Sequence, residues 1–274
     1  MSRKLNFIPT IKDYDHIRGL MAEDLRYCLA ERHHRTDWGR PLYYRINVQL
    51  IMTQECPFLC PFCLERKNPM KGEQDFPAQL ASLVEVLSQH PGARLSVTGG
   101  EPGLYPEQVR RIARIYRAIS DNTFLSVNTA GIDPTLTEFA HVNLSWNDYV
   151  QTDASLFPGC TLQTVLDDEH MTLDNVRAFI KNHPEAQGFS FRFLSGLERH
   201  DYPVDIWNEL ERDPGFTVGT FRIGDFFAYA TFDYKGVHGR ITLGDMYQQK
   251  HNDYRDGYSN VIIHPDGHVA VNWT

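Results

Sequence analysis

From residue 43 onward, short apolar runs of strand type alternate with amphipathic runs of helical period, and this alternation restricts the fold more than any other feature. Strands are expected at 43–52, 94–98, 124–129, 141–146, 188–194 and 216–223. Helices are expected at 76–90, 106–120, 133–140, 171–182 and 205–211. Such an alternation predicts a parallel sheet, open or curled toward a barrel, whose functional residues gather at the carboxyl ends of the strands.

Three parts of the chain follow from this pattern. Residues 1–42 form an N-terminal extension, with an amphipathic helix expected over 13–35, and residues 43–223 form the alternating core. Residues 147–169 fit a long connection. Residues 224–274 change to aromatic-rich, hairpin-like segments, in which Asp266-Gly267 has the composition of a hairpin turn. We expect this last part to cap the substrate site.

The charge balance argues against polyanionic partners. The chain has 274 residues, with 27 Lys and Arg against 35 Asp and Glu, which gives a formal net charge of −8. Nucleic-acid binding generally needs a basic surface. No apolar run approaches the roughly 20 residues that span a bilayer, and the N-terminus lacks the features of a signal peptide. We therefore expect a cytoplasmic protein that binds neither nucleic acid nor membrane.

The most specific chemical signal is a cysteine triplet. Cys56, Cys60 and Cys63 lie in MTQECPFLCPFCLER, directly after the first expected strand. Three thiolates on one loop can each bind one iron of a [4Fe–4S] cluster and leave the fourth iron open to another ligand. Zinc is the alternative, but it normally needs a fourth Cys or His ligand. The other candidate ligands, which lack a typical partner spacing, are Cys28, Cys160, His33 and His34.

A second motif follows the next strand. Residues 98–103 read TGGEPG, in which Gly99 and Gly100 allow a close backbone approach and Glu101 supplies an acceptor for an ammonium group. A tight turn between strand and helix explains a glycine pair equally well. The motif gains weight only beside the cysteine triplet.

Together, Cys-x3-Cys-x-aromatic-Cys and Gly-Gly-Glu-Pro, in this order, resemble the radical S-adenosylmethionine (SAM) enzyme family. The resemblance implies a partial (β/α)6 TIM-like barrel, here with an N-terminal helix and a C-terminal β-hairpin flank. It also implies a [4Fe–4S] cluster on Cys56, Cys60 and Cys63, with S-adenosyl-L-methionine as cofactor and an electron donor such as flavodoxin or ferredoxin. The implied chemistry is reductive cleavage of SAM to a 5′-deoxyadenosyl radical, which abstracts hydrogen from a substrate.

The resemblance also implies cofactor contacts. Gly99, Gly100 and Glu101 match the motif that holds the methionine ammonium, and Phe62 matches the aromatic residue near adenine. The other implied contacts are Ser145 and Asn128, at the ends of strands, and Arg192, which is placed to meet a carboxylate. Backbone capping at strand ends is the alternative for Ser145 and Asn128. A structural ion pair is the alternative for Arg192.

Within that family, the tail resembles that of the GTP cyclase of molybdenum-cofactor biosynthesis, but with departures. No cysteine follows Cys160, so a second cluster is excluded. Val261, Ile262 and Ile263 stand where that enzyme has nucleotide-binding arginines, and the chain does not end in Gly-Gly. We expect residues 226–240 and 261–272 to line the substrate pocket and GTP to be a poor ligand.

A small-molecule substrate is the primary hypothesis. The alternatives are radical modification of a peptide and a metal-stabilised binding protein without turnover. Cys160 is a candidate catalytic hydrogen donor, although a free cysteine is more often a small buried hydrophobe. Other side chains that could face the cavity, unless they pack over the barrel mouth, are Tyr229, Tyr234, His238 and Arg240.

Overall fold

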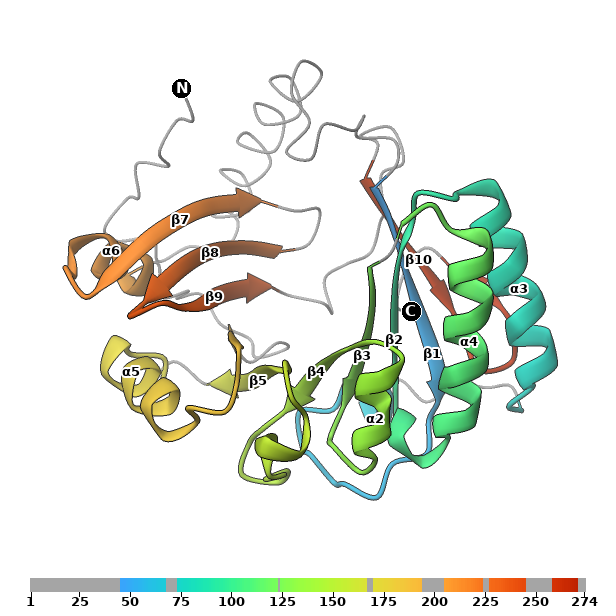
Figure 1. Cartoon of the computed structure of the whole chain (residues 1–274), viewed down its shortest axis with the longest axis horizontal. Coiled ribbons are helices and arrows are strands. Elements are labelled where there is room, and N and C mark those ends of the chain that lie inside the picture. The colour runs from blue at the N-terminus through green and yellow to red at the C-terminus, as the bar shows by residue number, and fades with distance from the viewer. Residues whose placement is uncertain are drawn as a thin grey trace, which may run out of the picture.

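The fold is a single curled sheet of eleven strands with helices on its outer side (Figure 1). The computed structural model describes residues 45–67, 73–122, 124–166, 170–193, 205–223, 227–244 and 258–270. The strand order is β11-β10-β1-β2-β3-β4-β5-β6-β9-β8-β7. The helix expected over 13–35 and its run of basic residues lie outside the described residues.

The core of the sheet consists of six parallel strands in sequence order. These are β1 (Arg45–Thr53), β2 (Arg94–Gly99), β3 (Leu125–Thr129), β4 (His141–Ser145), β5 (Thr161–Leu166) and β6 (Gly188–Phe193). The helices are α2 (Leu64–Lys67), α3 (Phe76–Gln89), α4 (Pro106–Ile119), α5 (Leu173–Asn182) and α6 (Asp205–Arg212). Short 3-10 turns are η2 (Pro102–Leu104), η3 (Pro134–Glu138) and η4 (Ala154–Leu156). The six strands with helices outside them confirm the expected partial barrel.

The fifth strand was not predicted. β5 lies within 147–169, which the sequence pattern presents as one long connection. Its crossover from β4 contains η4 rather than an α-helix, so the alternation of strand and helix is interrupted there. Gly188–Phe193 is consequently the sixth strand of the barrel and not the fifth. Phe216–Ile223, expected as the sixth, is the outermost antiparallel strand, β7.

The C-terminal part extends both edges of the core and is more than a flanking hairpin. β8 (Phe227–Tyr234) and β9 (Val237–Gly244) form a hairpin, and β9 pairs in parallel with β6. β10 (Tyr258–Ile263) pairs in parallel with β1 on the other side and then turns into β11 (Val269–Ala270). Gly267, at φ +85°, lies in that turn, as the Asp-Gly pair predicts.

The outer face of the sheet is the hydrophobic core. Alternate strand residues such as Val48 and Leu50 pack there with apolar residues of α3 and α4, and both are fully buried. Val261 and Ile263 of β10 belong to the same core, so the expectation that they line a substrate pocket is wrong. Their register beside Val48 and Leu50 turns them toward the helices.

The inner face is polar instead. Because side chains alternate along a strand, the residues between those core positions point away from the helices. They are mostly hydroxyl, amide and cationic side chains: Gln49, Ser96, Thr98, Ser126, Asn128, His141, Asn143, Ser145, Thr161, Gln163, Ser190, Arg192 and Arg240. Barrels with a packed interior usually fill it with branched apolar residues. A polar interior is suited to binding a polar ligand.

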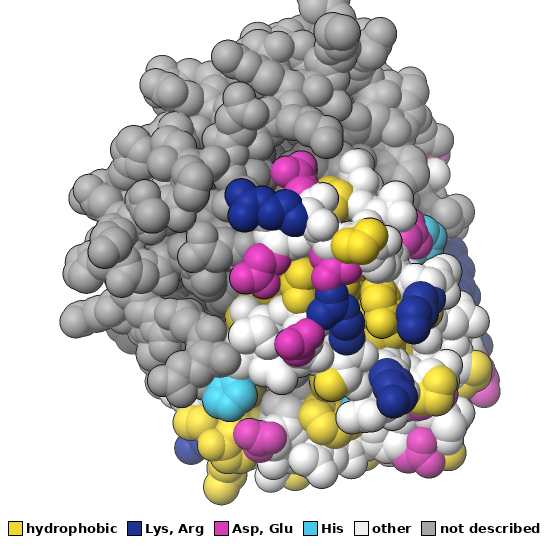
Figure 2. All heavy atoms as spheres, turned by 90° about the vertical axis from the view of Figure 1, so that its left-hand side faces the viewer, with side chains coloured by type: hydrophobic (Ala, Val, Ile, Leu, Met, Phe, Trp, Pro, Cys, Tyr) yellow, Lys and Arg dark blue, Asp and Glu magenta, His cyan; other side chains and the backbone are white. Residues whose placement is uncertain are grey.

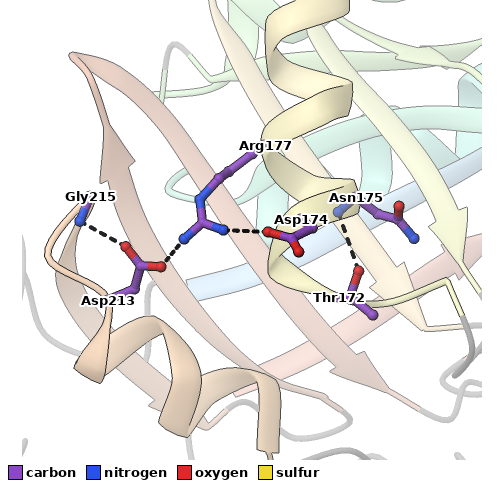
Figure 3. Close-up of polar contacts among 6 residues, drawn as sticks. All are labelled: Thr172, Asp174, Asn175, Arg177, Asp213 and Gly215. Carbon is purple, nitrogen blue, oxygen red and sulfur yellow. Dashed lines mark hydrogen bonds and ion pairs between the residues drawn. The ribbon is translucent and has the colours of Figure 1, made fainter.

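Helices α5 and α6 are joined through one arginine on the outside of the barrel (Figure 3). Arg177 of α5 pairs with Asp174, 2.6 Å away, and with Asp213, which follows α6. Asp213 also accepts a hydrogen bond from the N–H of Gly215 at 2.8 Å, and Thr172 caps α5. Arg177 lies over the ring of Phe216, with its guanidinium carbon 5.3 Å from the centroid. These contacts fix β7 against the helices that follow β5 and β6.

The surface on this side of the molecule has mixed charge. Figure 2 shows acidic and basic side chains interspersed with apolar ones over the described residues. No broad area of one sign is visible on that part of this face. Among the described residues, no helix is long and apolar enough to cross a membrane.

Candidate active site at the carboxyl rim of the barrel

The cysteine triplet lies on the loop that leaves the carboxyl end of β1. Cys56, Cys60 and Cys63 are all partly exposed, and the N–H of Cys63 donates to the carbonyl of Cys60 at 3.2 Å. α2 begins directly after Cys63. The three thiols therefore share one short loop at the rim where the strands end.

The root of this loop is bonded to the loop that follows β2. The N–H of Gly100 donates to the carbonyl of Thr53 at 2.6 Å, and the N–H of Glu101 donates to the carbonyl of Glu55 at 2.7 Å. The hydroxyl of Tyr105 donates to the Glu55 carboxylate at 2.5 Å, a bond that raises the pKa of Tyr105. Two sequence motifs more than 30 residues apart are thus one structural unit.

The glycine pair is required by that contact. Gly99 has φ +122°, a conformation that side chains disfavour, and a Cβ on it would collide with the carbonyl oxygen of Thr53. A Cβ on Gly100 would collide with the backbone of Gln54 and Glu55. The glycines let the two loops approach, in addition to any approach to a ligand.

Glu101 is fully buried and is bonded to its own chain. Its carboxylate accepts hydrogen bonds from the hydroxyl of Thr129, from the N–H of Ala130 at 2.5 Å and from the N–H of Gly103 at 2.7 Å. Burial raises its pKa, and these three bonds oppose the rise. The side chain joins the ends of β2 and β3, so an ammonium contact from this residue stays a prediction.

The electrostatics of the thiols suit a cationic centre. Burial raises the pKa of Cys60, and the charges of Cys63 and Cys56 raise it further. Burial also raises the pKa of Cys56, and a smaller contribution comes from Glu101. Thiolates crowded in this way repel one another unless they bind a cation. The donor set fits an iron–sulfur cluster, although no three His, Cys, Asp or Glu side chains of the described residues converge into a metal-binding group.

Three further predicted cofactor contacts lie near the same rim. Phe62, on the cysteine loop, makes an edge-to-face contact with Tyr149 at a centroid distance of 6.2 Å. Ser145 is the last residue of β4. Asn128 of β3 donates to Ser96 at 3.2 Å and accepts from Asn143 at 3.0 Å. The structure thus brings these residues to the expected end of the sheet, and their cofactor roles stay predictions.

Arg192 lies on β6, next to the last residue of that strand. Its Nε atom is buried and has no hydrogen-bond partner. Burial, followed by the charge of Arg240, lowers its pKa to about 10. Arg192 forms no ion pair among the described residues. The alternative role of Arg192 in a structural ion pair therefore finds no support. Its guanidinium remains charged at neutral pH.

Cys160 is at the other end of the barrel. It precedes the first residue of β5, at the amino end of that strand, while the cysteine triplet follows the carboxyl end of β1. Its side chain is fully buried in the hydrophobic core, and burial raises its pKa to about 11. The structure corrects the proposed catalytic role and favours the alternative, a small buried hydrophobe.

Sequence reasoning missed Gln163 and understated Arg240. Gln163 lies on the undetected β5, beside Ser190 of β6, and its Nε2 atom is buried without a partner. Arg240 of β9 donates from Nε to the hydroxyl of Ser190 at 2.9 Å. By contrast, Tyr234 stacks on Phe216, outside the barrel. The alternation of polar and apolar residues in TLQTVL is the one signal that pointed to β5.

Comparisons with known proteins agree with this geometry. Residues 50–153 match the family model described as the Radical SAM superfamily. Over 91 residues, or 33% of this chain, the sequence is 25% identical to a protein of Thermoplasma volcanium named "Probable GTP 3',8-cyclase". The match covers 27% of that protein, so the chain spans about a quarter of the curated relative.

Solved structures support the fold. The crystal structure of Streptococcus suis SuiB bound to S-adenosylmethionine is similar with a TM-score of 0.52 at 12% identity, over 81% of this chain and 59% of that one. SuiB bound to the precursor peptide SuiA gives a TM-score of 0.51 at 12% identity, over 98% of this chain and 67% of that one. At this level of identity the likeness concerns the fold alone.

Proposed function

Because the chain belongs to the radical SAM superfamily, we propose that it cleaves S-adenosylmethionine reductively and removes a hydrogen atom from a small-molecule substrate. Proteins of this superfamily use a [4Fe–4S] cluster, which here would be held by Cys56, Cys60 and Cys63. When bound, the cluster and S-adenosylmethionine supply a one-electron cleavage of the sulfonium that yields a 5′-deoxyadenosyl radical. The reducing electron would come from a donor such as flavodoxin or ferredoxin.

One observation carries this proposal: the cysteine loop and the Gly-Gly-Glu loop are bonded together at the rim of a polar barrel. Gly100 and Glu101 bond the backbone of Thr53 and Glu55, directly before Cys56. A ligand held by one loop therefore lies within reach of the other. Cosubstrate and cluster need this arrangement, since electron transfer requires them in contact.

The remaining predicted contacts have distinct tasks. The backbone of Gly99–Glu101 would hold the methionine ammonium, Phe62 would lie beside adenine, and Ser145 and Asn128 would bond the ribose or methionine. Asn128 already bonds Ser96 and Asn143, which fixes the orientation of its amide. A fixed amide at the rim loses little rotamer entropy when a ligand binds.

The test is anaerobic reconstitution of the full chain, followed by measurement of bound iron and of 5′-deoxyadenosine after reduction with dithionite. We expect about four irons and four sulfides per chain and slow cleavage of S-adenosylmethionine. Cys160→Ala is the matched control, since this cysteine lies in the core, and it should retain the iron. Stoichiometric zinc, or iron that is equally bound by Cys60→Ala, would contradict the proposal and favour a metal-stabilised binding protein.

GTP is the first substrate to test because of the named relative. Val261 and Ile263, at positions where the cyclase tail carries arginines, are buried in the outer core and offer no charge to a nucleotide. We therefore expect GTP to leave 5′-deoxyadenosine production at its background level. A rise in 5′-deoxyadenosine production on adding GTP would instead favour a nucleotide cyclase.

A peptide substrate is the second candidate. It is supported by the similarity to SuiB, whose structure was determined with its precursor peptide. A screen of metabolites and of short peptides for stimulated cleavage separates the two candidates. Stimulation by peptides alone would favour the second.

A further inference from the structure

The inner face of β5 and β6 holds two buried hydrogen-bond donors that have no partner. These atoms are Nε2 of Gln163 and Nε of Arg192. In the strand register Gln163 lies beside Ser190, and Arg192 follows two residues later on the same face. A buried donor without a partner has lost its hydrogen bonds to water and gained none in return, which destabilises the fold. Two such donors on adjacent strands point to a ligand that supplies acceptors.

The charge of the same patch favours an anion. Arg192 forms no ion pair among the described residues, and Arg240 of the neighbouring strand acts on it as a like charge. Arg240 also lowers the pKa of His141 on β4, although burial has the larger effect. The strand β9 therefore adds positive charge behind Arg192. A carboxylate or a phosphate would accept hydrogen bonds from Arg192 and offset the charge of that guanidinium.

The position of the patch favours the substrate as the source of that anion. The ammonium and carboxylate of S-adenosylmethionine sit on one carbon atom, so they bind side by side, and the ammonium is expected at the end of β2. Three strands, β3, β4 and β5, separate β2 from β6 in the sheet. Adjacent strands lie roughly 4.8 Å apart. Arg192 is thus displaced from the methionine end of the cosubstrate, whereas Gln163 on β5 lies beside Ser145, a predicted cosubstrate contact.

We infer that Gln163 and Arg192, supported by Arg240, bind an anionic group of the substrate, a carboxylate or a phosphate. The substrate would then be a negatively charged small molecule. This inference rests on the proposed function. The carboxylate of S-adenosylmethionine has the same chemistry as such a group. The competing outcome is therefore that Arg192 binds S-adenosylmethionine instead.

The experiment measures two affinities on the cluster-loaded full chain by calorimetry under anaerobic conditions. One is for S-adenosylmethionine, and the other is for inorganic phosphate added to enzyme saturated with S-adenosylmethionine. The variants are Arg192→Gln, which removes the charge, and Gln163→Leu, which removes the donor at similar volume. Arg110→Gln, on the outside of α4 and paired with Glu107, is the matched control. Thermal melts check that each variant folds.

We expect phosphate to bind the saturated enzyme, and Arg192→Gln to weaken it about tenfold or more, since a hydrogen bond to a charged group is lost. Gln163→Leu should weaken it several-fold. The affinity for S-adenosylmethionine should change less than about twofold in Arg192→Gln. A large loss of S-adenosylmethionine affinity in Arg192→Gln, or competition between phosphate and S-adenosylmethionine, would overturn the inference. So would phosphate binding that is absent or unchanged in both variants. Failure of the proposed function is distinct, because the wild-type chain would then not bind S-adenosylmethionine.

Discussion

The two sides of the barrel rim are built in different ways. At the ends of β1 and β2 the functional loops are held by backbone, through the Gly100–Thr53 and Glu101–Glu55 hydrogen bonds and two glycines that admit no Cβ. Across the barrel, the inner face of β5, β6 and β9 presents side chains, of which Gln163 and Arg192 keep buried donors unpartnered. The backbone N–H groups of the first side are already hydrogen-bonded within the chain, whereas the second side keeps buried donors that a ligand can use.

We propose that this difference separates the binding of the cofactor from the choice of substrate. Backbone that is fixed by its own hydrogen bonds keeps the same shape whatever the neighbouring side chains are, so it suits a cofactor that does not change. A wall of side chains is altered by single substitutions, so it suits the choice of substrate. We expect substitutions on the first side to abolish all chemistry and substitutions on the second to change ligand preference.

The largest effect should come from the cysteine loop. Replacing Cys56, Cys60 or Cys63 singly by alanine removes one of the three proposed thiolate ligands, so cluster iron and 5′-deoxyadenosine should both fall to background. Iron assay and visible absorbance under anaerobic conditions measure this loss. Retention of a full cluster in any one of the three variants would show that another ligand from the chain takes its place.

Next in size is the glycine that holds the two loops together. Gly100→Ala places a methyl group against the backbone of Glu55, which must shift and move the root of the cysteine loop. We expect bound iron to fall several-fold, measured after the same reconstitution. Gly236→Ala is the control: its φ is +84°, but nothing lies within 4 Å of the added Cβ. It should cost about 1–2 kcal/mol of stability and leave the iron unchanged; equal iron loss in both variants would refute the argument from close approach.

The sequence predicts the first side of the barrel far better than the second. Cys56 to Cys63 and Gly99 to Glu101 are short local motifs, and β1 and β2 are well-marked apolar strands, so both site and topology could be inferred there. The sequence pattern singles out Arg192 but places it on the fifth strand, because β5 follows a crossover without an α-helix and is not predicted. Gln163 and Arg240 lie near Arg192 only because of the strand register, which cannot be read from the composition of the sequence. The tail likewise predicts a hairpin, yet not that β10 would join β1.

A smaller effect on the first side should follow from Glu101→Ala. This change leaves the hydroxyl of Thr129 and the N–H groups of Ala130 and Gly103 without their buried acceptor. We expect a loss on the order of 3 kcal/mol in the free energy of unfolding, together with weaker binding of S-adenosylmethionine and retained iron. Urea unfolding and calorimetry measure the two effects. Glu107→Ala, whose carboxylate pairs with Arg110 on the surface, should change stability by less than about 1 kcal/mol. Identical results for both glutamates would mean that the buried bonds contribute nothing.

The smallest effect concerns the pH dependence of the second side. Burial, and then the charge of Arg240, lowers the pKa of His141, whose Nε2 lies 2.9 Å from the hydroxyl of Thr161. Since the folded pKa lies below the unfolded value of about 6.5, His141 contributes stability that is present above pH 6.5 and is lost as the pH falls through the folded pKa.

The free energy of unfolding should therefore decrease less steeply between pH 7 and pH 5 in His141→Asn than in the wild type. Arg240→Gln should also reduce the slope, because the like charge is gone, whereas His90→Asn at the end of α3 serves as the surface control. Parallel pH profiles for His141→Asn and the wild type would show that the cationic patch exerts no field on β4, and would weaken the case for an anion site there.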